Sequence, residues 1–187
     1  MLLLKVCGMR DSKNIVELLN VQPDFVGFIF HEKSSRNVSS KIGIEIPDSI
    51  NRVGVFVDED ELFIESKIKE FKLSHVQLHG FESPQFCKKM KSLGIKTIKA
   101  FNIHPGFDFG MLAEYEPHCD YFLFDAFGKK AGGNGIVFNW NLLTNYKGNI
   151  PFLLSGGIDE TMVNKLKKIK HSQFVGIDIN SKFETAA

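Results

Sequence analysis

The chain is built from short apolar runs separated by amphipathic or polar segments. Most runs hold about four to six residues and are nearly continuous in apolar, often β-branched or aromatic, side chains. This pattern is typical of strands that are buried on both faces of a parallel sheet. It predicts eight strands: Leu2–Val6, Phe25–Phe30, Arg52–Val57, His75–Leu78, Lys96–Ala100, Tyr121–Phe124, Phe152–Leu154 and Phe174–Ile177.

The segments between these strands carry helix signals. Pro84 occupies a first-turn position, where its missing N–H costs nothing, and Asp159 is interpreted as a helix cap. The signals predict four helices: Asp11–Asn20, Glu59–Phe71, Ser83–Ser92 and Asp159–Lys168. The patterns in Ser39–Ile46 and Gly106–Tyr115 are weaker, so we expect only short helical turns there.

Eight strands that alternate with helical segments fit either a closed (β/α)8 barrel or an open doubly wound sheet. The count of eight favours the barrel, although 187 residues is short for a fold that usually exceeds about 200. No helical segment follows the eighth predicted strand. We therefore expect an α/β protein with one domain over residues 1–187, a (β/α)8 TIM barrel that lacks its last helix.

Composition narrows the function classes. Apolar residues make up 43% and charged residues 24%, as in ordinary soluble proteins, and a net charge of +1 does not indicate a nucleic-acid-binding surface. No apolar run approaches the ~20 residues needed to span a bilayer, and the opening LLLKV is too short for a signal peptide. The three cysteines form an odd set without metal-ligand spacing. We expect a cytoplasmic protein with no nucleic-acid or membrane partner.

In a (β/α)8 barrel the chemistry is located at the carboxyl ends of the strands. Cys7 follows the first strand, where it is either a small buried hydrophobe or a thiol at the mouth of an active site. Asp125 ends the sixth strand, where partial desolvation would prepare a carboxyl group to donate a proton; capping of the next loop is the alternative. Cys87 and Cys119 fall away from the strand ends and are interpreted as structural.

Two other strand ends suggest an anionic ligand. Gly156 and Gly157 lie between the seventh strand and a helix, so their N–H groups would suit a phosphate at the usual phosphate site of this fold; a plain tight turn is the alternative. Arg36 lies in a serine-rich loop, where its guanidinium would match a carboxylate or would simply be solvated. His79 taken alone is best explained as a buried, hydrogen-bonded imidazole.

Nine ordered segments carry a resemblance to a known family: Lys5–Arg10, Gly27–Phe30, Lys33–Arg36, Val53–Val57, Val76–Gly80, Lys99–Phe101, Gly132–Gly135, Ser155–Gly157 and Gly176–Asp178. In this order and spacing they resemble the phosphoribosylanthranilate isomerase family of tryptophan biosynthesis. The match extends over essentially the whole chain. Each motif is weak alone, but the ordered set is highly specific.

The resemblance implies an Amadori rearrangement of N-(5-phosphoribosyl)anthranilate, a small-molecule substrate, to 1-(2-carboxyphenylamino)-1-deoxyribulose 5-phosphate. No metal or organic cofactor is implied, because the iminium itself is the electron sink. Cys7 matches the family's general base, Asp125 its general acid, and Arg36 the residue near the anthranilate carboxylate. The other implied binding residues are Gln77 and His79 in the pocket, and Gly156, Gly157, Asp178, Asn180 and Ser181 around the phosphate. A monomer or a homodimer is expected.

The chain departs from the family pattern in two places. The loop Gly132–Ile136 lacks the usual basic residue, and Asn139 replaces the usual acid, which bears on loop closure and helix capping. The segment Asn180–Lys182 stands where Ser-Ser-Gly is common, so Lys182 would either assist or crowd the phosphate. Neither departure involves the two residues that match proton-transfer groups.

Lys5 is a candidate for activating the thiol. It precedes Cys7 by two residues and therefore shares its strand face, about 6.6–6.8 Å away along the strand. The thiol of a cysteine in a model peptide has a pKa of about 8.5, so it is mostly protonated at neutral pH. A cation on the same face is therefore expected to favour the thiolate.

Two other functions fit part of the pattern. Another phosphate-binding barrel, such as a sugar-phosphate epimerase or the next enzyme of the pathway, would need metal-binding His or Asp groups or additional catalytic Lys or Glu residues. The pairing of Cys7 with Asp125 disfavours it. A non-catalytic barrel that binds a phosphorylated ligand would keep Gly156 and Gly157 but has no need of the thiol and the acid.

Overall fold

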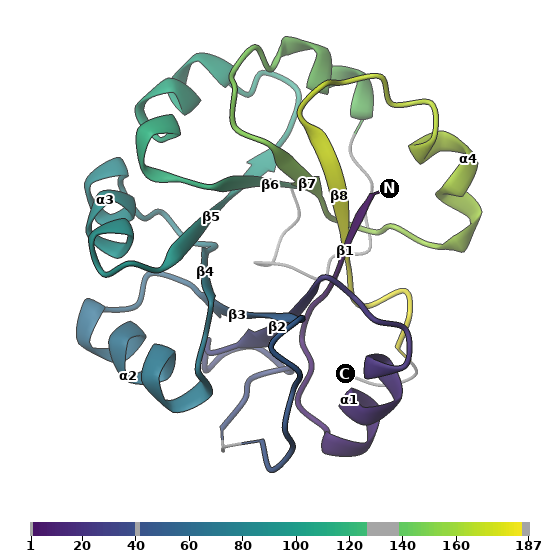
Figure 1. The fold of residues 1–187 in the computed structure, drawn as a ribbon. Helices are drawn as coiled ribbons and strands as arrows, with labels where there is room; N and C mark the ends of the chain where they lie inside the picture. Colours follow the sequence, from purple (N-terminus) through teal and green to yellow (C-terminus); the bar gives the residue numbers. More distant parts are fainter. Residues whose placement is uncertain (1, 40–41, 127–138, 185–187) are drawn as a thin grey trace.

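The computed structural model describes residues 2–39, 42–126 and 139–184. Eight parallel strands follow one another around a closed barrel, and β8 pairs with β1 to complete it (Figure 1). The closed barrel is confirmed, and the open sheet is excluded. The strands are β1 (Leu3–Val6), β2 (Phe25–Ile29), β3 (Asn51–Phe56), β4 (His75–Leu78), β5 (Lys96–Ile103), β6 (Tyr121–Ala126), β7 (Phe152–Leu154) and β8 (Phe174–Ile179).

All eight predicted strands are present, but three of them extend beyond their predicted ends. β5 and β6 continue together, because Asn102 pairs with Asp125 and Ile103 with Ala126. β8 likewise continues past Ile177 to Ile179. Asp125 is therefore the last residue but one of β6, since a polar side chain at the barrel mouth does not interrupt main-chain pairing.

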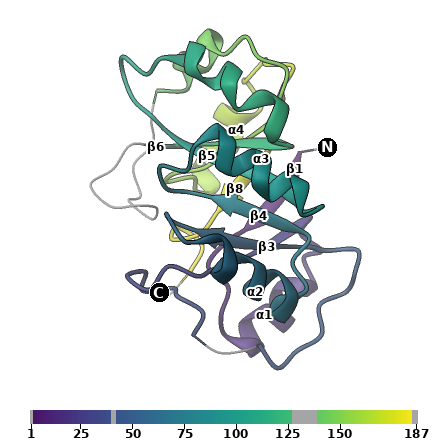
Figure 2. The same cartoon turned by 90° about the vertical axis from the view of Figure 1, so that its left-hand side faces the viewer.

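The four predicted helices are present with shorter bounds. They are α1 (Ser12–Leu19), α2 (Glu61–Phe71), α3 (Pro84–Ser92) and the short pair η4 (Glu160–Met162) and α4 (Val163–Leu166). Asp159 caps η4 by accepting a hydrogen bond from the Thr161 N–H at 2.9 Å, as predicted. α2 packs on β3 and α3 on β5 (Figure 2).

The weaker connections contain only 3-10 turns. η1 (Phe109–Glu114) and η2 (Glu116–His118) lie in the fifth connection, as expected. Within Ser39–Ile46, the described residues contain no helix, so the short turn expected there is absent from that part. η3 (Trp140–Asn145) was not predicted; the Asn139 side chain caps it by accepting from the Asn141 N–H at 3.1 Å.

The described residues after β8, 180–184, form a turn that runs towards α1 (Figure 1). No helix follows β8 within them, as expected. None of the helices in the described ranges is long and apolar enough to cross a bilayer.

The core has two layers, because side chains alternate between the two faces of each strand. The barrel interior is filled by Phe25, Val53, Ile98, Ala100, Leu123 and Leu153. A larger apolar cluster lies between the strands and the surrounding helices. Each large side chain buried in this way contributes about 1.5–3 kcal/mol. The interior also contains the fully buried Lys5, two residues before Cys7.

Candidate active site

Cys7 lies directly after β1 and is held by the neighbouring strand. Its N–H donates to the carbonyl of Ile179 at 3.0 Å, and its carbonyl accepts from Asn180 Nδ2 at 3.1 Å. Gly8 has φ +76°, and a Cβ there would come within 2.7 Å of both Arg36 Cδ and Asn180 Nδ2. Only glycine fits this position without strain, so the thiol is fixed at the barrel mouth.

The thiol shares the interior with a buried ion pair. Lys5 Nζ lies 2.9 Å from Asp178 Oδ2, and the two residues are register partners of β1 and β8. A Cβ on Gly27 would come within 2.9 Å of Cys7 Sγ and 3.2 Å of Lys5 Nζ, so the thiol and the ammonium lie side by side. The expected cation is therefore present, but a carboxylate partly neutralises it.

These neighbours act on the thiol in opposite directions. Burial raises the pKa of Cys7, the Lys5 ammonium lowers it, and the Asp178 carboxylate raises it again. The net pKa of the thiol lies above its ordinary value. Lys5 thus limits a shift that burial would otherwise make larger.

Asp125 projects into the same end of the barrel from β6 and is buried. Its Oδ1 accepts from the N–H of Ala126 at 2.9 Å, and its Oδ2 faces His79 Nε2 at 3.3 Å. The Gln77 amide nitrogen lies 2.9 Å from His79 Nδ1, on the side of the imidazole away from Asp125. Gln77, His79 and Asp125 therefore lie in a row that ends at the carboxyl group.

Gly156 and Gly157 have φ of +90° and +62°, so both adopt the left-handed region that favours glycine. A Cβ on Gly156 would come within 2.7 Å of Asp125 Oδ1 and of the Ala126 nitrogen. The turn is therefore tight, as the simpler interpretation held, and it also brings the main chain against Asp125.

Two adjoining hollows collect the predicted site residues. A cavity of about 80 Å³ is lined by Cys7, Arg36, Gln77, His79, Asp125, Asp178 and Asn180, among others. A second, of about 30 Å³, is lined by Gly156, Gly157, Asp178, Asn180, Ser181 and Lys182, among others. Ser155, Asp178 and Asn180 border both. All ten residues nominated from the sequence therefore meet at one end of the barrel.

Arg36 is not a solvated loop arginine. Its Nε donates to Glu184 Oε2 at 2.9 Å, and its Nη2 pairs with Glu184 Oε1. Sequence reasoning missed Glu184, because nothing in the local pattern links two residues on opposite sides of the barrel seam. One edge of the guanidinium is occupied in this way, while Arg36 still borders the larger cavity.

The remaining predictions concern residues away from these hollows. Cys87 and Cys119 are buried free thiols in contact with each other, outside both hollows. The altered loop Gly132–Ile136 lies outside the described residues. Within the described part of the chain, no three His, Cys, Asp or Glu side chains converge as metal ligands would.

The model of one protein family, described as N-(5'phosphoribosyl)anthranilate (PRA) isomerase, matches residues 4–186. The chain belongs to this family. An N-(5'-phosphoribosyl)anthranilate isomerase of Phocaeicola vulgatus is 45% identical over 185 residues, which is 99% of this chain and 90% of that protein. This PRA isomerase family member is thus an aldose–ketose isomerase of tryptophan biosynthesis.

Solved structures of PRA isomerases share the fold. The enzyme of Thermotoga maritima superimposes with a TM-score of 0.85 at 29% identity, covering 99% of this chain and 90% of that one. A second, with a TM-score of 0.82, 28% identity and the same coverage, is a complex with reduced 1-(o-carboxyphenylamino)-1-deoxyribulose 5-phosphate. Family membership favours this activity over the two alternative functions considered from the sequence.

Proposed function

We propose that the chain converts N-(5'-phosphoribosyl)anthranilate to 1-(2-carboxyphenylamino)-1-deoxyribulose 5-phosphate by an Amadori rearrangement, with Asp125 as general acid and Cys7 as general base. The observation that carries this proposal is the convergence of Cys7, Asp125 and Arg36 on one cavity that adjoins the glycine-lined hollow. The relative crystallised with the reduced product supports the same ligand class.

The first step needs a proton donor. Asp125 protonates the furanose ring oxygen, the C1–O bond breaks, and the nitrogen lone pair forms the iminium (Schiff base) at C1. His79 supports this role by position, since its Nε2 lies 3.3 Å from Asp125 Oδ2 and its Nδ1 lies 2.9 Å from the Gln77 amide nitrogen. His79 and Gln77 therefore orient the acid and do not react themselves.

The second step needs a base. The Cys7 thiolate removes the proton from C2, and the electron pair of that C–H bond moves into the iminium to give an enolamine. Tautomerisation of the enolamine then gives the ketone product. No oxidant or reductant takes part, because the substrate supplies its own electron sink.

Anion binding orients the substrate for both steps. The free donors of the Arg36 guanidinium suit the anthranilate carboxylate. Gly156, Gly157 and Ser181 offer N–H groups around the smaller hollow, where Lys182 adds a positive charge. Asp178 and Asn180 border both hollows and therefore face the sugar between its two anionic ends.

A turnover assay tests the proposal. Purified chain is mixed with N-(5'-phosphoribosyl)anthranilate, and the change in anthranilate fluorescence is followed over time. We expect the signal to change at a rate proportional to enzyme concentration, with formation of the deoxyribulose phosphate confirmed by mass analysis. A rate equal to that without enzyme would contradict the proposal.

Replacing Lys5 by methionine is expected to raise the pKa of the Cys7 thiol further, because the ammonium that favours the thiolate is removed. Iodoacetamide reacts with the thiolate, so inactivation should require a higher pH than in the wild type. Asp178→Asn removes an opposing carboxylate and should shift the profile to lower pH. An unchanged profile in Lys5→Met would exclude Lys5 from thiol activation.

A further inference from the structure

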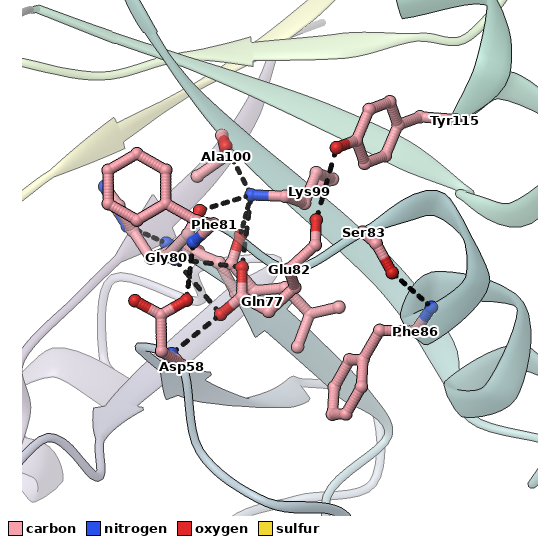
Figure 3. Close-up of polar contacts among 12 residues, drawn as sticks. Asp58, Gln77, Gly80, Phe81, Glu82, Ser83, Phe86, Lys99, Ala100 and Tyr115 are labelled. Carbon is pink, nitrogen blue, oxygen red and sulfur yellow. Dashed lines mark hydrogen bonds and ion pairs between the residues drawn. The ribbon is translucent and has the colours of Figure 1, made fainter.

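A second buried ion pair lies just outside the cavity, under the loop that follows β4. Lys99 Nζ, on β5, is 3.2 Å from Glu82 Oε2, and both side chains are only 3% exposed. Figure 3 shows the ammonium surrounded by the carboxylate and by main-chain oxygens. The mechanism proposed above gives this pair no role.

The ammonium binds the main chain on both sides of His79. Lys99 Nζ donates to the carbonyl of Leu78 at 3.2 Å and to that of Gly80 at 2.9 Å. It also donates to the carbonyl of Ala100 at 2.9 Å (Figure 3). A single charged group on the neighbouring strand therefore holds the carbonyl groups of the residues before and after His79.

The carboxylate fixes the same loop from the other side. Glu82 accepts from the N–H of Gly80 at 3.0 Å and from the N–H of Asp58 at 3.0 Å (Figure 3). Asp58 Oδ1 in turn accepts from the N–H of Phe81 at 2.6 Å. A Cβ on Gly80 would come within 2.3 Å of Asp58 Oδ1, so these two loops pack closely.

Burial of a lysine and a glutamate contributes little stability by itself, since the desolvation of both charges offsets their attraction. An apolar pair of the same size would serve the core as well. What an apolar pair lacks is the ability to bind five main-chain groups, three of which belong to the residues on either side of His79. The buried ion pair is therefore explained by the loop conformation that it holds after β4, and not by the stability that it adds.

We propose that Lys99 and Glu82 are positioning residues that fix the main chain around His79 and so aim its imidazole at Asp125. The inference rests on the proposed function, in which Asp125 is the general acid. Lys99 and Glu82 contact neither hollow and act only through His79.

The decisive variant is Lys99→Met/Glu82→Gln, which removes both charges together and so leaves no unpaired buried ion. We expect it to fold, with kcat lowered by about tenfold to a hundredfold, the range expected when a catalytic group is displaced by about 1 Å. KM should change little, because neither residue borders the substrate hollows. Thermal unfolding, measured beside kcat and KM, separates a loss of stability from a loss of positioning.

A second background tests the route through His79. In His79→Ala, the double substitution should lower kcat no further, because the group that it positions is already absent. Wild-type kcat in the folded double variant, or an undiminished fall in the His79→Ala background, would overturn the proposal. If the double variant does not fold, Glu82→Asp replaces it, because it keeps the charge and draws the carboxylate back from the loop; a smaller fall in kcat is then expected, and an unchanged kcat would contradict the proposal.

The matched control is Lys67→Met/Glu70→Gln, which removes an ion pair of the same residue types from α2 at 2.7 Å. It is expected to keep wild-type kcat. Asp125→Asn, assayed in parallel, separates the two hypotheses. Normal turnover in Asp125→Asn would contradict the role of Asp125 as general acid. A loss of turnover in Asp125→Asn together with a normal kcat in the Lys99/Glu82 variant would contradict only the positioning role.

Discussion

Cys7→Ser is expected to lower kcat by about 10²- to 10⁴-fold, the contribution typical of a general acid or base. A serine hydroxyl is nearly the size of the thiol but does not ionise near neutral pH, so the C2 proton would lose its acceptor. The main-chain contacts of residue 7 to Ile179 and Asn180 do not involve the sulfur, and the cavity should keep its shape. Affinity for the reduced product analogue, measured by calorimetry, should therefore remain close to that of the wild type.

Cys87→Ala provides the control, because that thiol is buried in α3 outside both hollows. It is expected to cost some stability and to keep kcat. Turnover near the wild-type level in Cys7→Ser would remove Cys7 from the role of base, and the family resemblance of the KVCGMR segment would then need another explanation.

Asp125→Asn is expected to reduce kcat by a similar factor of about 10²–10⁴. The amide has the same shape and still accepts the N–H of Ala126 through its oxygen, but it has no acidic proton for the ring oxygen. Ring opening should become rate-limiting, while binding of the product analogue, which is already open, should be affected little. Single-turnover fluorescence measures the step directly.

Asp120→Asn is a matched control at the opposite end of the same strand. Asp120 precedes β6 and accepts from the N–H of Thr97 at 2.9 Å, far along the strand from the mouth of the barrel. Its substitution should lower the midpoint of thermal unfolding and leave kcat in place. If Asp125→Asn also kept its turnover, another group would have to supply the proton.

The barrel could be predicted from the sequence because its strands are buried on both faces and read as apolar runs. The strand ends could not be placed in the same way. β5, β6 and β8 continue beyond the apolar runs, since Asn102, Asp125 and Asp178 join the sheet with polar side chains. Apolar residues show where the side chains of a strand are buried, whereas the end of a strand is set by its main-chain hydrogen bonds to the neighbouring strands.

The site residues could be nominated because the family motifs carry them, but their partners could not. Arg36 pairs with Glu184, which is 148 positions away in the sequence. Lys99 on β5 binds the carbonyl of Leu78 on β4, next to His79. Such contacts depend on barrel closure and on side-chain direction, and neither can be predicted from the residues that are close together in the sequence. Strand alternation correctly places Lys5 beside Cys7, but it carries no signal for the pairing of Lys5 with Asp178 on β8.

The Lys5–Asp178 pair joins the first strand of the chain to the last, 173 residues apart. During synthesis on the ribosome, Lys5 and Cys7 emerge early, yet Asp178, which opposes Lys5, and Asn180, which holds the Cys7 carbonyl, emerge only with β8 and the turn after it. The thiol therefore acquires its native environment at the moment when the ring of strands closes. The chemical reactivity of the thiol therefore reports whether β8 has paired with β1.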